Sequence, residues 1–140
     1  MATPPKNTDN LNKAVVAYLD GRRLKGCIYN FSALKESFIL FPESDPLQHR
    51  GTEVQVKDLK AVFFVKNFAG NPGYHESQEV ANPTHGHKVV VTFSDGEKMV
   101  GITEAYNPQK PGFFLFPADP NSNNIRIFVV NKNVRQVQVG

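Results

Sequence analysis

Few side chains in this chain have the types and spacing that chemistry needs. The histidines are the first candidates. His85 and His87 form an "HGH" pair, and His75 lies upstream of them. A metal site needs several such ligands held in a fixed geometry, and these three fall in or beside a connector that precedes an apolar stretch. We therefore interpret them as linker residues, and the sequence predicts no metal site.

The single cysteine, Cys27, is the second candidate. One thiol can form no disulfide within the chain, which agrees with a reducing compartment. Cys27 aligns with Ile102 in the internal repeat described below, so its position accepts an aliphatic side chain. We expect a small buried hydrophobic residue, and not a nucleophile.

Two aspartates, Asp20 and Asp95, are the third candidate because they occupy matched positions. Each precedes a glycine between two apolar stretches, where aspartate favours turn geometry for its own sake. No nucleophile, base and orienting group can be assembled from the chain, and no phosphate-binding loop is present. The sequence predicts a protein that is not an enzyme and has no cofactor.

Composition indicates a globular chain. It has 140 residues, 40% apolar and 21% charged, and no apolar run approaches the roughly 18 residues that cross a bilayer. Residues 1–12 contain no apolar core of a secretory signal, so we expect a flexible tail and a cytoplasmic protein without membrane contact. The net charge of +3 is small and unclustered, which disfavours nucleic acid as the partner.

The elements that position these residues are repeated. With a shift of 75 residues, "AVVAYLDGRRLKG" falls on "VVVTFSDGEKMVG", and "SFILFPESDP" falls on "GFFLFPADPN", without a gap. So many apolar, glycine and proline matches in one register indicate a duplicated unit. We predict a first unit at residues 13–65, a connector at 66–87 and a second unit at 88–140.

Each unit has the pattern of a small β-barrel. β-Branched and aromatic runs flank an Asp-Gly pair, the strongest short-range signal of a tight hairpin. Gly26 and Gly101 fall in the returning strand, where a glycine permits a bulge or bend. "FILFP" or "FFLFP" forms a third strand, and two more short strands follow. The prediction is all-β, with five strands per unit.

The strand "FFLFP" is apolar on both faces. Alternation places Phe114 and Phe116 opposite to Phe113 and Leu115. One face of the strand packs in the barrel of its own unit, so the apolar side chains on the other face need a second packing partner. We expect that partner to be the other unit or a second copy of the chain.

The order of parts resembles the Sm-like and SH3-like small-barrel families. "VxYLDGRRLKGxIxxF", from Val16 to Phe31, is similar to the first Sm motif, and "VVNKNVRQV" is similar to the second. "KPGFFLFPADPNSNNIRIFVV" and "LKAVFFVKNFAGNPGYHE" resemble uncharacterised bacterial domains found beside PilZ and other signalling domains. The resemblance implies two tandem five-stranded small barrels in a bacterial, cytoplasmic, regulatory protein.

The Sm resemblance does not extend to the uridine-binding residues, an Asp and an Asn after the first motif and an Arg-Gly in the second. Those places hold Ser32 and Asn107, Ser37 and Gly112, and Gln55-Val56 and Val130-Asn131. Single-stranded RNA binding is therefore the alternative function, and it would combine basic residues with aromatic stacking surfaces. The candidates for that role are Arg22, Arg23, Lys25, Tyr29, Phe31, Lys98 and Tyr106.

The connector offers a candidate partner-binding face. Phe68 and Tyr74 flank a Gly-Asn-Pro-Gly turn, and they either pack the seam between the units or contact a partner. We predict a non-enzymatic binding or regulatory module that acts through protein contacts, with another protein or with its own copy. A further alternative is a small-molecule sensor seated between the barrels.

Overall fold

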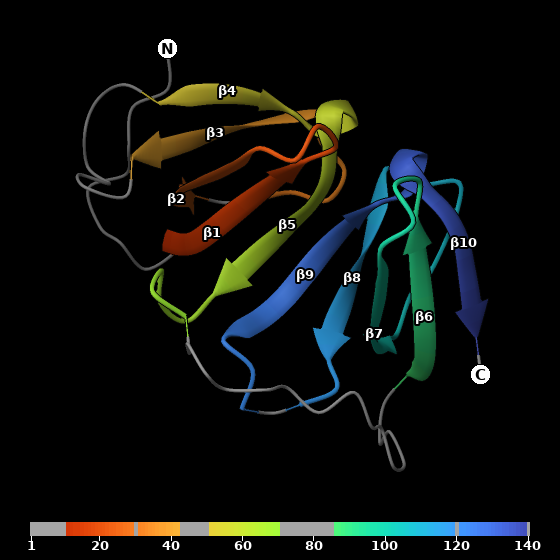
Figure 1. Cartoon of the computed structure of the whole chain (residues 1–140). Helices are drawn as coiled ribbons and strands as arrows, with labels where there is room; N and C mark the ends of the chain where they lie inside the picture. The colour runs from red at the N-terminus through yellow and green to blue at the C-terminus, as the bar shows by residue number, and fades with distance from the viewer. Residues whose placement is uncertain (1–10, 30, 43–50, 71–85, 120, 140) are drawn as a thin grey trace.

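The protein is all-β, as the sequence predicts. A computed structural model describes residues 11–29, 31–42, 51–70, 86–119 and 121–139 (Figure 1). The first half contains β1 (Leu11–Tyr18), β2 (Arg23–Tyr29), β3 (Ser37–Pro42), β4 (Thr52–Gln55), the 3-10 turn η1 (Val56–Asp58) and β5 (Leu59–Val65). The second half contains β6 (His87–Phe93), β7 (Lys98–Thr103), β8 (Gly112–Pro117), β9 (Asn124–Val130), η2 (Asn131–Asn133) and β10 (Val134–Val139). In these residues no helix is long and apolar enough to span a membrane.

Both predicted Asp-Gly hairpins are present. Gly21 and Gly96 adopt φ angles of 95° and 92°, which a residue with a side chain rarely tolerates. The carboxylate of Asp20 accepts a hydrogen bond of 3.0 Å from the backbone amide two residues later, and that of Asp95 accepts the equivalent bond at 3.0 Å. The structural interpretation of the matched aspartates is confirmed.

The ten strands form one antiparallel sheet, in the order β10-β6-β7-β8-β9-β5-β1-β2-β3-β4. Two tandem five-stranded barrels are not confirmed, because the sheet is continuous and open. The physical reason is that β5 and β9, the edge strands of the two halves, pair with each other, Phe63 opposite Ile127 and Val62 opposite Phe128. We call this junction the seam; β4 and β10 remain as the outer edges (Figure 1).

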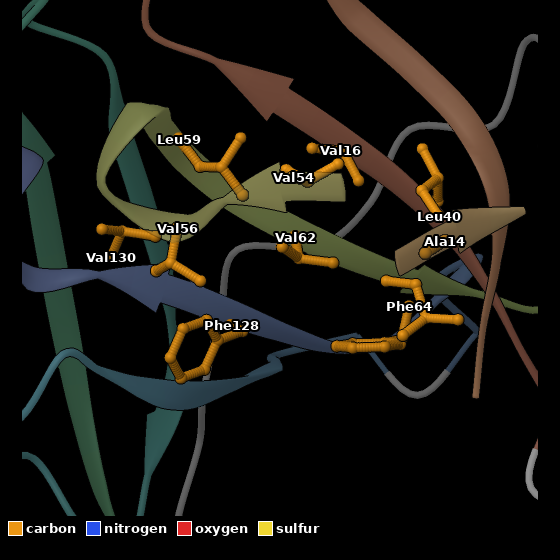
Figure 2. Packing of buried hydrophobic residues seen from close by; sticks show 11 residues of the cluster. Ala14, Val16, Leu40, Val54, Val56, Leu59, Val62, Phe64, Phe128 and Val130 are labelled. Carbon is orange, nitrogen blue, oxygen red and sulfur yellow. The ribbon is translucent and has the colours of Figure 1, made fainter. Parts of the chain in front are cut away.

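Each half has a hydrophobic core that borrows side chains across the seam. The first core is built on the first half but includes Phe128 and Val130 of β9, which Figure 2 draws together with Val62 and Phe64 of β5. The second core includes Ala61 of β5, with Phe63 packed against it. Successive residues of a strand point to opposite faces, so β5 and β9 serve both cores at once.

The strand "FFLFP" is covered from within the chain, as one of the two expectations had it. Phe113 and Leu115 lie in the second core. Phe114 packs on the opposite face against the first core. Phe116, on the same face as Phe114, stays 39% exposed. The other half is therefore the cover for Phe114, and Phe116 is left without one.

Polar groups also join the halves across the seam. Lys60, whose side chain is 8% exposed, donates to Asp95 at 2.8 Å and to Glu97 at 3.1 Å. Burial alone would lower the pKa of Lys60, but the hydrogen bonds that its ammonium donates to the two carboxylates outweigh this effect and raise the pKa above its usual value. The side-chain amide of Asn133 donates to the carbonyl of Leu59 at 2.6 Å.

Candidate binding surfaces at the seam

Among the described residues, three surface cavities are each lined by residues of both halves. The largest, of about 380 Å³, we call the seam groove. Its floor consists of apolar side chains on strands of both halves, namely Val15, Phe63, Val65, Met99 and Ile127. Its polar wall consists of Arg23, Glu97, Lys98, Asp119, Asn123 and Asn124.

Arg23 and Lys98 are equivalent positions of the repeat, and the fold brings both into the seam groove. Arg23 lies with its guanidinium 5.5 Å from the ring centre of Phe63. Among the described residues, neither Arg23 nor Lys98 forms an ion pair. The groove is therefore lined by two cations that form no direct ion pair with a described carboxylate.

The two carboxylates of the same wall are engaged. Glu97 pairs with Lys60 at 3.1 Å. Asp119 is buried, and its carboxylate accepts a hydrogen bond of 2.8 Å from the backbone amide of Asn121, which holds the turn after β8. The acidic groups in the groove thus hold local structure, whereas Arg23 and Lys98 are exposed.

A second cavity, of about 270 Å³, lies where the β2–β3 and β7–β8 loops meet. Leu34 is 71% exposed at its rim. Tyr106 is 38% exposed, with its ring edge-on to that of Phe113, which lines the cavity, at 5.0 Å. We call this surface the apolar patch, and its members are Ala33, Leu34, Ala105, Tyr106 and Phe116.

The third cavity, of about 310 Å³, lies beside the two 3-10 turns. Lys57 and Lys132, another repeat-equivalent pair, line it together with Glu36. Val56 and Val130 form part of its base. The seam thus presents matched basic residues at two places.

The basic residues predicted to bind nucleic acid lie in different surroundings in the structure. Arg22 is held on its turn by Asp20 at 2.8 Å and lies 4.4 Å above the ring of Tyr18. Lys25 donates to the backbone carbonyl of Phe68 at 3.0 Å. Of the predicted set, only Arg23 and Lys98 line the same cavity.

The aromatic residues predicted for base stacking do not line the seam groove. Phe31 packs in the first core, edge-on to four phenylalanines and 5.1 Å from the rings of Phe64 and Phe128. Tyr29 packs edge-on to Phe41 at 5.4 Å. Tyr106 belongs to the apolar patch. The structure does not bring these rings together with the cations.

The connector residues are described only in part. Phe68 is half-buried, whereas Tyr74 lies outside the described residues, as do His75 and His85. His87 is exposed at the start of β6. Cys27 is buried, as expected for a structural thiol. Within the described ranges, no three potential ligands gather in a geometry that could hold a metal ion.

The sequence analysis did not predict the apolar patch, although the alignment of the two repeats contains one indication of it. Leu34 aligns with Gln109 in the second repeat, so the fold does not require an apolar residue at this position. A large apolar side chain that the fold does not bury is an indication of contact with a partner.

The fold and the seam define an internally duplicated all-β protein whose cavities lie where its halves join. Residues 10–140 match the family model described as a family of unknown function (DUF6982), and the chain belongs to this family. Neither the curated proteins nor the solved structures include a match to the chain.

Proposed function

We propose that the protein is a non-enzymatic binding module that acts through protein contacts at the apolar patch. The observation that carries this proposal is the exposure of Leu34 and Phe116 at one cavity, with the exposed Tyr106 packed against Phe113 of its lining. In this proposal the two halves are tandem Sm-like or SH3-like small barrels that share strands at the seam, and the module serves bacterial regulation.

The size of the cavity favours a protein partner. Small-molecule sites usually measure about 300–1,000 Å³, and the hollow of about 270 Å³ falls below this range. It suits one apolar side chain of a partner, inserted between Leu34 and Phe116. Glu104 and Lys110 line the same hollow and supply the polar rim that protein interfaces usually have.

A different protein fits the patch better than a second copy of this chain. Tyrosine and phenylalanine are typical anchors of interfaces between unlike chains. The described ends of the sheet, by contrast, are polar, which opposes assembly of the chain with itself through its edges.

The test uses the charge variants Leu34→Asp and Phe116→Asp, with Ile125→Asp as the matched control. Ile125 is 55% exposed and does not line the cavity. We expect quantitative affinity enrichment from the native host to recover specific proteins with the wild type and the control. Both patch variants should lose them by more than tenfold, with unchanged melting temperatures.

Direct binding of a recovered protein, measured by calorimetry with purified components, completes this test. Retention of the same proteins by both patch variants would exclude the patch as the binding surface. A doubled mass of the isolated chain that the patch variants abolish would identify the partner as a second copy.

Single-stranded RNA remains the alternative partner, supported by the exposed cations Arg23, Lys25 and Lys98. Its support is weaker because Phe31 packs in the first core and is not an exposed stacking surface. RNA binding through these cations predicts an electrophoretic shift that weakens steeply with salt. No shift at low salt would end this alternative.

A further inference from the structure

The seam groove has the features of a second binding site, separate from the apolar patch. None of the residues that line the groove lines the cavity of the patch. From its charges and its floor we infer that the seam groove binds a small organic anion with an apolar body, held by Arg23 and Lys98.

The charge of the groove selects an anion. Arg23 and Lys98 have no carboxylate partner in the described part of the chain. Of the two acidic residues in the lining, Glu97 pairs with Lys60, and Asp119 is buried and accepts a backbone amide, so Arg23 and Lys98 are the charged groups of the lining that form no ion pair with a described residue. Arginine presents a planar fork of donors that matches a carboxylate, sulfonate or phosphate group.

The floor of the groove selects an apolar body. Phe63, Val15, Met99 and Ile127 line the same groove as the two cations. Methionine adapts to irregular apolar shapes and contacts aromatic rings favourably. The volume of about 380 Å³ lies within the usual range of about 300–1,000 Å³ for small-molecule sites.

The wall is held in place before any ligand arrives. The side chain of Asn123 donates to the carbonyl of Asn67 at 2.9 Å and accepts from the amide of Asn67 at 3.2 Å. This pair ties the turn before β9 to the segment after β5. Because the two halves are thereby fixed to each other at the groove, binding need not order them.

The probe is 8-anilinonaphthalene-1-sulfonate, which carries one sulfonate on apolar rings and fluoresces when they are buried. The variants are Arg23→Met, Lys98→Met and the double variant, since methionine keeps much of the apolar stem of each side chain. Lys132→Met, at the third cavity, is the matched control. Leu34→Asp serves as the control for binding at the apolar patch.

We expect one saturable site in the folded wild type. Each single groove variant should weaken its affinity about two- to fivefold, the range for one partly exposed ion pair, and the double variant should weaken it further. Lys132→Met and Leu34→Asp should bind as the wild type does. Octanoate should displace the probe more effectively than inorganic phosphate, because only octanoate has an apolar body.

Three results would each overturn the inference. The first is undiminished affinity in the double variant while its melting temperature matches the wild type. The second is equal affinity for the uncharged analogue N-phenyl-1-naphthylamine, which would remove the role of the cations. The third is loss of probe binding in Leu34→Asp alone, which would place the probe on the apolar patch.

Discussion

Phe128 tests whether the two halves fold as one unit. It belongs to β9 in the second half, yet its ring packs in the first core, 5.1 Å from that of Phe31 and 5.4 Å from that of Phe114. Phe128→Ala removes this ring and leaves a cavity that the neighbouring strands fill only in part. The first half should lose stability because of a change in the second.

The expected loss follows from the burial of the ring, which is 1% exposed. Truncation of a buried phenylalanine to alanine costs about 3–5 kcal/mol of unfolding free energy. The unfolding entropy is about 2.1 cal/mol/K per residue, so over 140 residues this loss lowers the melting temperature by roughly 10–17 °C.

The assay is differential scanning calorimetry, supported by urea denaturation followed by circular dichroism. The wild type and Phe128→Ala should each show one transition whose calorimetric and van't Hoff enthalpies agree. The matched control is Glu53→Ala, because Glu53 is the repeat equivalent of Phe128 and is exposed on the outer strand β4. This control should change stability by less than about 0.5 kcal/mol.

Two outcomes would refute the reasoning. A split of the Phe128→Ala melt into two transitions would show that the halves unfold independently and that the seam is a weak contact. A loss below about 1 kcal/mol would show that the ring is not packed as described.

Further predictions concern the ion pairs of Lys60, the close packing at Gly101 and the outer strands of the sheet. Lys60→Met should lower the unfolding free energy by about 1 kcal/mol at pH 7. The hydrogen bond from Lys60 holds the pKa of Asp95 below 3.8, so this stabilisation is present above about pH 4 and is lost in acid, where urea denaturation should no longer separate variant from wild type. Gly101→Ala should destabilise by about 1–3 kcal/mol in the same assay, because its Cβ would lie 2.6 Å from the carbonyl oxygen of Phe116; an unchanged midpoint would contradict the close approach. Glu53→Phe combined with Gln138→Phe should make the chain associate in sedimentation velocity, and a monomeric double variant would show that edge polarity is not what prevents pairing.

The strands and hairpins could be predicted from the sequence because their signals are local. Asp-Gly pairs require the positive φ of a tight turn, and the 75-residue register located the same strands twice. The two-sided apolar pattern of "FFLFP" also indicated that a cover was needed. That β5 would pair with β9 could not be predicted, because alternation shows which faces are apolar and not which strand lies beside them.

The sequence indicated individual residues of the seam groove but not that they lie together. Arg23 and Lys98 stand out as basic, matched positions, but a repeat in sequence does not tell how the two copies are oriented in space. Their meeting in one groove depends on the seam, which tertiary packing decides. Leu34 escaped notice because a single apolar residue in a loop has no periodic pattern to mark it.

The two repeats match in sequence register but differ in polarity at the strands that form the seam and the outer edges. Side chains that cross the seam are apolar, namely Ala61, Phe63 and Phe128. Their repeat equivalents on the outer strands are polar, namely Gln136, Gln138 and Glu53. Polar side chains at these positions oppose edge-to-edge pairing, so we expect the seam to join the two halves without adding further copies. On this reasoning the apolar patch and the seam groove, and not the sheet edges, are the surfaces that we propose for binding.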